Sequence, residues 1–238
     1  MAQNSAPRSS ASSRPAFSEV ADFVTIWAAD ALRASEYLRF RIEALKAAEG
    51  RPEPAARFLR RAIEVHLDRG LGSCPFREAE FARLIEDGIL RTHDRRARLL
   101  AWTVMPNHVH VLCERKEGVG LRSLVSGWKT TGVRRLNARC GRTGVLWARD
   151  VLHRPLSDPA DYRRAVAYVE ANPLMAGLVR DHAEHRCSSR RFRTVHELLD
   201  AAELSAAAEA ARATPSSTTR RGSRAGTTAL RSEPPIFD

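Results

Sequence analysis

The sequence has few cysteines and no long apolar run. Its four cysteines, Cys74, Cys113, Cys140 and Cys187, lie far apart and form no C-x-x-C pair, which argues against both a zinc ribbon and a disulfide framework. No apolar stretch approaches the roughly 20 residues that span a bilayer, and the N-terminus lacks a cationic segment leading into an apolar one. We therefore expect a cytoplasmic protein with reduced thiols and no membrane partner.

Acidic residues are scarce in one part of the chain. The net charge is +11, and between Arg115 and Arg154 ten basic residues face only two acidic ones. The tail from Arg212 adds a net charge of +3, and the remaining residues balance to zero. Positive charge confined to one block is typical of a site for a polyanion such as nucleic-acid phosphate. A merely solvated basic helix is the alternative.

The length and the distribution of residue types predict one folded domain. With 238 residues, of which 43% are hydrophobic, the chain can build one sizeable core. We predict a domain over residues 17–204 with a helical insertion at 30–70. Residues 1–16 and 205–238 are rich in Ser, Ala, Pro and Arg, a composition that predicts disorder.

Periodicity and turn residues predict the elements of this domain. We expect strands at Phe23–Trp27, in the hairpin described next and at Leu146–Leu156, and helices at Ala31–Ala48, at Ala55–Leu67, from Cys74 to about Ile89, after Gly120 and from Pro159. Leu124, Val125 and Trp128 would form the apolar stripe of the helix after Gly120. Asp158 fits the N-cap of the last helix, and Pro173 should end that helix near Asn172.

Two histidines in the run WTVMPNHVHVLCE carry the most specific local signal. The turn residues Met105, Pro106 and Asn107 separate two apolar runs and predict a hairpin. Residues two apart on a strand face the same side, so His108 and His110 could bind one divalent metal ion. Two ligands alone do not make a metal site, and a pair of histidines on a half-solvated sheet face is the alternative.

The last predicted helix adds a polar row beside its apolar stripe. Arg164, Tyr168 and Asn172 are four residues apart, so their side chains are neighbours on the helix surface. From spacing alone, a tyrosine in this place is more often a packed ring than a functional group.

Several motifs in order resemble one family. The runs WTVMPNHVHVLCE, SGWKTT, LWARDV and YVEANPLMAGLV are similar to those of the REP-associated tyrosine transposases, relatives of small transposases that act on single-stranded DNA. The resemblance covers about Phe23 to Phe192. It implies that His108, His110 and Asn172 hold a divalent metal and that Tyr168 is the nucleophile.

The resemblance also implies a fold, an activity and a substrate. The expected fold is α+β, a ferredoxin-like antiparallel sheet with helices on one face. The expected activity is metal-dependent cleavage and rejoining of single-stranded, hairpin or repetitive palindromic DNA through a 5′-phosphotyrosine, which makes the chain a transposase and places it at the nucleoid. Mixed nitrogen and amide ligands favour Mg²⁺ or Mn²⁺; a zinc set of His153, His182 and His185 is the alternative. The family pattern allows a homodimer.

The basic block supplies candidate DNA contacts. These are Arg122, Lys129, Arg134, Arg135, Trp147, Arg149 and Arg154, with phosphate contacts from the cations and a stacking face from the indole. Core anchoring is the alternative for Trp147 and the preferred interpretation for Trp128. Arg164, one turn before Tyr168, could favour the phenolate.

Two other functions remain open at this point. A catalytically silent DNA-binding protein would keep the fold and bind DNA without cutting it. A metal-dependent hydrolase of a small anionic substrate would turn over without a protein-linked intermediate.

Overall fold

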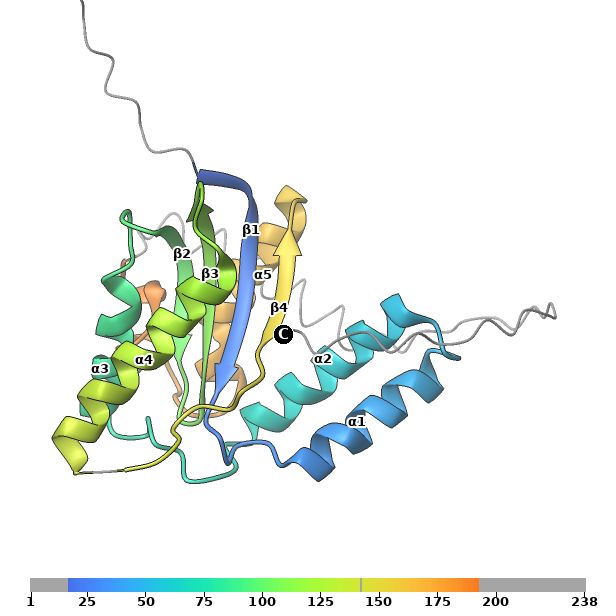
Figure 1. The fold of residues 1–238 in the computed structure, drawn as a ribbon, viewed down its shortest axis with the longest axis horizontal. Coiled ribbons are helices and arrows are strands. Elements are labelled where there is room, and N and C mark those ends of the chain that lie inside the picture. The colour runs from blue at the N-terminus through green and yellow to red at the C-terminus, as the bar shows by residue number, and fades with distance from the viewer. Residues whose placement is uncertain (1–16, 142, 193–238) are drawn as a thin grey trace, which may run out of the picture.

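The computed structural model describes residues 17–141 and 143–192 (Figure 1). The elements, in chain order, are β1 (Phe17–Trp27), α1 (Ala34–Ala47), α2 (Pro52–Asp68), α3 (Ala79–Leu90), β2 (Ala97–Val104), β3 (His108–Lys116), α4 (Leu121–Cys140), β4 (Leu152–Leu156), α5 (Pro159–Met175) and the short 3₁₀ helices His182–Glu184 and Ser189–Phe192. The predicted disorder of 1–16 and 205–238 lies outside the described residues. No helix in the described part of the chain is long and apolar enough to cross a membrane.

Four antiparallel strands form one sheet in the order β2-β3-β1-β4. β1 lies in the middle, with Thr25 opposite His110 of β3 and opposite Leu152 of β4. This order, with helices after β1 and after β3, is that of the ferredoxin-like fold. The predicted α+β class and antiparallel sheet are confirmed.

Helices cover both faces of the sheet, whereas the resemblance led us to expect them on one. α3 and α4 pack on the face that carries Val24, Ile26, Val109 and Val111. α5 packs on the opposite face, against Phe23 and the neighbouring residues of that face, and Figure 1 shows α4 in front of the sheet and α5 behind it. The strands alternate apolar residues on both sides, so the second face also needs a cover, which the helix after β4 provides.

The predicted insertion is a pair of helices, α1 and α2, that projects from one side of the sheet (Figure 1). Its base is a separate apolar cluster in which Ile63 and Leu67 of α2 pack with Trp27 of β1 and Leu152 of β4. This packing brings the last turn of α2 to the edge of the sheet.

Two predicted boundaries were wrong. The strand expected at Leu146–Leu156 is ordered as β4 only from Leu152, and Trp147 forms a single bridge with Ala28. The last helix continues through Pro173 to Met175. Pro173 removes one hydrogen-bond donor, but the N–H groups of Ala176 and Leu178 still donate to Asn172 and Pro173 carbonyls, which closes the final turn. The predicted cap was right, since Asp158 accepts a hydrogen bond from the Ala160 N–H at 2.9 Å.

Candidate functional site

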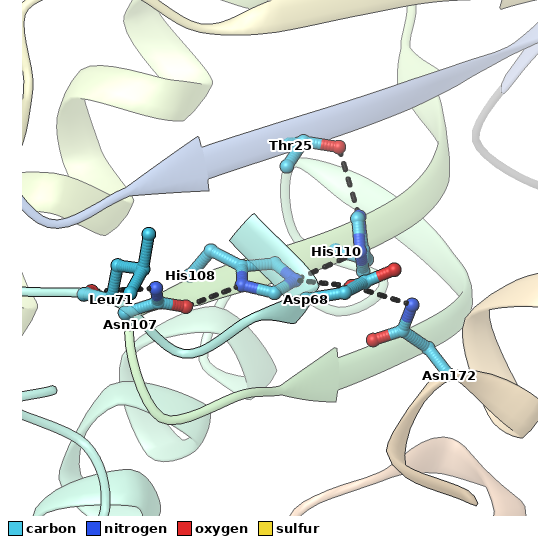
Figure 2. Close-up of polar contacts among 7 residues, drawn as sticks. All are labelled: Thr25, Asp68, Leu71, Asn107, His108, His110 and Asn172. Atoms are coloured by element: carbon cyan, nitrogen blue, oxygen red, sulfur yellow. Dashed lines mark hydrogen bonds and ion pairs between the residues drawn. The ribbon is translucent and has the colours of Figure 1, made fainter. Parts of the chain in front are cut away.

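The two histidines of β3 lie under α5, on the same face of the sheet. Both are fully buried, which excludes the half-solvated arrangement. Their Nε2 atoms are 3.1 Å apart (Figure 2). Burial holds the pKa of His110 at about 3. Burial, with the charge of His110 adding to it, holds the pKa of His108 well below its usual value. Both imidazoles are therefore neutral near pH 7, the form that binds a metal ion.

Hydrogen bonds set the orientation of each ring. Asn107 donates its Nδ2–H to the Leu71 carbonyl at 2.9 Å, so its Oδ1 is free to accept from His108 Nδ1–H at 2.7 Å. The Nε2 of His108 then carries a lone pair. The Thr25 hydroxyl oxygen, Oγ1, lies 2.9 Å from His110 Nδ1, and this hydroxyl can donate or accept the hydrogen bond. These partners aim both Nε2 atoms at the same point, the arrangement found around metal-bound histidines.

Asp68, the last residue of α2, is the third member of the cluster. Its Oδ1 lies 3.7 Å from His108 Nε2, and Asp68, His108 and His110 are the one group of three or more potential metal ligands found within residues 17–141 and 143–192. The Asp68 side chain is 25% exposed whereas that of His108 is 1% exposed. Solvent therefore reaches the cluster from the side of Asp68.

Sequence reasoning missed Asp68, because no local motif surrounds it. One signal was available. An aspartate at the C-terminal end of a helix opposes the helix dipole, and a residue in such a position needs a compensating partner or a function.

Asn172 of α5 joins the cluster through Asp68. Its Nδ2 donates to Asp68 Oδ1 at 3.1 Å, while its own Oδ1 is buried and has no hydrogen-bond partner among the described residues. A buried acceptor without a partner is unfavourable; a rotation of the amide would turn this oxygen toward the Asp68 carboxylate, an arrangement of two acceptors that only a shared cation would favour. The donor set, two neutral imidazoles, a carboxylate and an amide oxygen, fits a divalent cation.

Tyr168 of α5 lies beside the imidazoles of its own chain. Its ring centroid is 5.5 Å from that of His110 and 6.0 Å from that of Phe23. Tyr168 is partly buried. Its ring therefore packs on Phe23 and also borders the cluster of His108, His110 and Asp68. Arg164, one turn earlier, is half-exposed and donates to Asp161.

Most of the predicted DNA contacts lie on the α4 side of the sheet, whereas Arg154 lies on the other side, with its guanidinium carbon 5.9 Å from the centre of the Phe23 ring. Arg122, Lys129 and Arg149 line a hollow of about 220 Å³ beside α4, and Arg134 is exposed farther along that helix. Arg135 pairs with Asp87 at 3.7 Å. These residues belong to the α4 side, opposite to the histidines.

Two of these predicted contacts have structural roles instead. Trp147 is 5% exposed, packs on Phe76 with ring centroids 4.8 Å apart and donates to the Lys129 carbonyl. It is a core anchor and presents no free stacking face, because the segment before β4 tucks it under α4. Lys129 donates to the carbonyls of Ala148 and Arg149 at 2.7 and 3.1 Å, and burial lowers its pKa to about 8.

The alternative zinc set is not assembled. His153 lies on the α4 side and pairs with Asp22 at 2.8 Å, whereas His182 and His185 follow α5 and belong to no metal-binding group found within the described ranges.

Comparisons with known proteins add the following. No protein-family model and no curated protein matches the sequence. Among solved structures, the chain is similar to a REP-associated tyrosine transposase bound to a REP hairpin, with 15% identity and a TM-score of 0.43 over 79% of this chain and 82% of that one. It is also similar to a candidate transposase from Deinococcus radiodurans, with 16% identity and a TM-score of 0.31 over 63% of this chain and 89% of that one. The first is a member of the family that the sequence motifs resemble.

Proposed function

We propose that this chain is a metal-dependent transposase that cleaves and rejoins single-stranded DNA through Tyr168. One observation carries the proposal. A tyrosine ring on α5 lies 5.5 Å from a buried, neutral histidine whose Nε2 meets that of a second histidine at 3.1 Å, with a carboxylate at the open side.

His108, His110, Asp68 and Asn172 would hold the metal ion, which we expect to be Mg²⁺ or Mn²⁺ because the set includes oxygen ligands. When bound, the ion offsets the charge of the scissile phosphate and orients it. Thr25 and Asn107 keep the two rings turned toward the ion. Asp68 is our addition to the ligands that the motifs implied.

Tyr168 would attack the phosphorus atom. A bond forms between its phenolic oxygen and phosphorus, the bond from phosphorus to the 3′-oxygen breaks, and the phenol proton is lost while the 3′-oxygen gains one. The 5′-phosphotyrosine keeps the energy of the broken bond, so a second 3′-hydroxyl can reverse the step without ATP. A phenol ionises near pH ~10 in water, so the nearby cation is needed to favour phenolate.

Single-stranded or hairpin DNA is the substrate that the motifs and the charge favour. The exposed Arg122, Arg134 and Arg149 of the positive block could contact phosphates of the part of the strand that reaches the α4 side of the sheet, opposite to the histidines, which would make binding dependent on salt.

The proposal is tested by detecting a covalent adduct between the protein and DNA. The protein is incubated with labelled hairpin oligonucleotides and Mn²⁺, and denaturing electrophoresis detects a protein-DNA conjugate. Tyr168→Phe should abolish the conjugate and leave DNA binding nearly intact. The matched control is Tyr162→Phe, which changes a partly buried tyrosine of the same helix and should keep the conjugate.

Two results would contradict the proposal. A conjugate that persists in Tyr168→Phe would exclude this residue as the nucleophile. DNA binding by the unaltered protein without conjugate or cleavage in Mg²⁺ and Mn²⁺ would favour the silent DNA-binding protein instead.

A further inference from the structure

A row of ionic side chains on α2 leads away from the candidate metal site. Arg60, Glu64 and Asp68 are four residues apart, so they follow one another along one side of this helix. Ile63 and Leu67, between them on the same helix face, pack on Leu152 of β4. The row therefore runs along the β4 edge of the sheet, beside the face that carries the histidines.

Arg154 meets this row from β4. It is two residues after Leu152 and thus on the same side of the strand, and it lies opposite Phe23 in the sheet. Its guanidinium carbon is 5.9 Å from the centre of the Phe23 ring. That ring contacts both His110, at 5.6 Å, and Tyr168, at 6.0 Å. One aromatic ring therefore separates Arg154 from the nucleophile.

Arg60 and Arg154 are close enough for their charges to interact. Burial lowers the pKa of Arg60, and the positive charge of Arg154 lowers it further. The acidic groups that interact with Arg60 are Glu64 and Glu53, and Glu64 also interacts with Arg154. Asp161 is 3.9 Å from Arg154, at the limit of an ion pair.

The positive charges of the two partly buried guanidiniums repel each other, and an anion bound between them would offset this repulsion. Arginine binds phosphate through paired N–H donors, and a strand of DNA that enters the site past Asp68 would run along the ionic row of α2 and past Arg154. We infer that Arg60 and Arg154 together bind one phosphodiester of the substrate strand, next to the one that Tyr168 attacks. The inference rests on the proposed function, and it makes the α1–α2 pair one wall of the DNA site.

The test measures binding separately from cleavage. Anisotropy of a labelled oligothymidine is followed over a salt series in EDTA, with full-length protein. Arg60→Ala and Arg154→Ala should each weaken binding roughly tenfold, and each should reduce the slope of log K against log salt by up to about 0.7. Because both side chains would bind the same phosphate, the double variant should lose less than the product of the two single effects.

The matched control is Arg39→Ala on α1, an arginine whose side chain is 60% exposed and pairs with Glu43 within its own helix. It should bind like the unaltered protein. Arg60→Lys and Arg154→Lys, which keep the charge and lose the paired donors, should keep the salt slope and recover only part of the affinity. Thermal unfolding of each variant verifies the fold.

The outcomes separate the two proposals. If Arg60→Ala and Arg154→Ala bind as tightly as Arg39→Ala at every salt concentration, the phosphate site is refuted, even when the unaltered protein forms a conjugate with DNA. If no conjugate forms but these variants still lose affinity, the phosphate site stands and the nucleophile assignment fails.

Discussion

The two faces of the sheet differ in how well the buried polar groups around Glu86 and around His108 are paired. On the α3–α4 face, both oxygens of the buried Glu86 have partners. Trp102 donates to one at 2.8 Å, and Arg191 pairs with the other at 3.1 Å. On the α5 face, two Nε2 atoms meet each other, and Asn172 Oδ1 has no hydrogen-bond partner in the described part of the chain. A buried acceptor without a partner is unfavourable in the protein alone and can be satisfied by a ligand, so this contrast supports our proposal that the metal ion binds on the α5 face.

The sharpest test of this contrast removes ligands from the α5 face. We expect His110→Ala to lower the affinity for Mn²⁺ by about 100-fold or more and Asp68→Asn by about 10- to 100-fold, since even partners of ligands have effects of this size. Isothermal titration calorimetry measures both. His93→Ala, which changes a histidine with a 46% exposed side chain, should bind as before. Unchanged affinity in Asp68→Asn would remove this carboxylate from the ligand set.

Substitutions on the α3–α4 face should change the free energy of unfolding and leave the affinity for Mn²⁺ unchanged. Leu124 of α4 is fully buried in the apolar cluster, and Leu124→Ala should lower the free energy of unfolding by about 2–5 kcal/mol because it leaves a cavity. Urea denaturation in EDTA measures the loss. Mn²⁺ affinity of the folded variant should equal that of the unaltered protein, and a coupled loss of both would break the contrast.

The smallest expected effect concerns Asp22, which is buried on β1 and pairs with Arg115 and His153. Burial raises the pKa of Asp22. The hydrogen bonds and charges of His153 and Arg115 lower the pKa by more than burial raises it, so the net pKa lies below its usual value. The folded state then binds this proton less readily than the unfolded chain. The stabilisation is fully present above about pH 4 and is lost as the pH falls below it.

Asp22→Asn should therefore reduce the free energy of unfolding by about 1–3 kcal/mol near pH 7. The difference between the two proteins should shrink at pH values below the usual carboxyl range. Urea denaturation at several pH values measures this. A difference that does not vary with pH would contradict the ionic role of Asp22.

Patterns within a few residues predicted what is local in this protein. The MPN turn predicted the hairpin, and strand alternation placed His108 and His110 on one side. Asp158 before Pro159 predicted a helix start. The apolar spacing around Trp128 predicted that its side chain is buried, and Trp128 is 2% exposed in the structure.

Contacts between distant segments could not be predicted in the same way. Asp68 reaches the histidines because Ile63 and Leu67 dock α2 on the sheet edge, and nothing near Asp68 in the sequence indicates that docking. Trp147 was ambiguous for the same reason, since only the path of the chain before β4 decides whether its ring is covered. The sequence also did not indicate that helices cover both faces of the sheet, because this depends on which face α5 packs against after β4.

The link from Leu71 to Asn107 makes the orientation of His108 depend on the segment that follows the helical pair. The carbonyl that orients His108 through Asn107 belongs to the segment just after α2, and the Phe76 N–H donates to the Pro106 carbonyl of the same turn. Excising the helical pair would thus remove Asp68, whose Oδ1 lies 3.7 Å from His108 Nε2, and would also displace the carbonyl that orients the same ring. The helical pair and the hairpin therefore position His108 together.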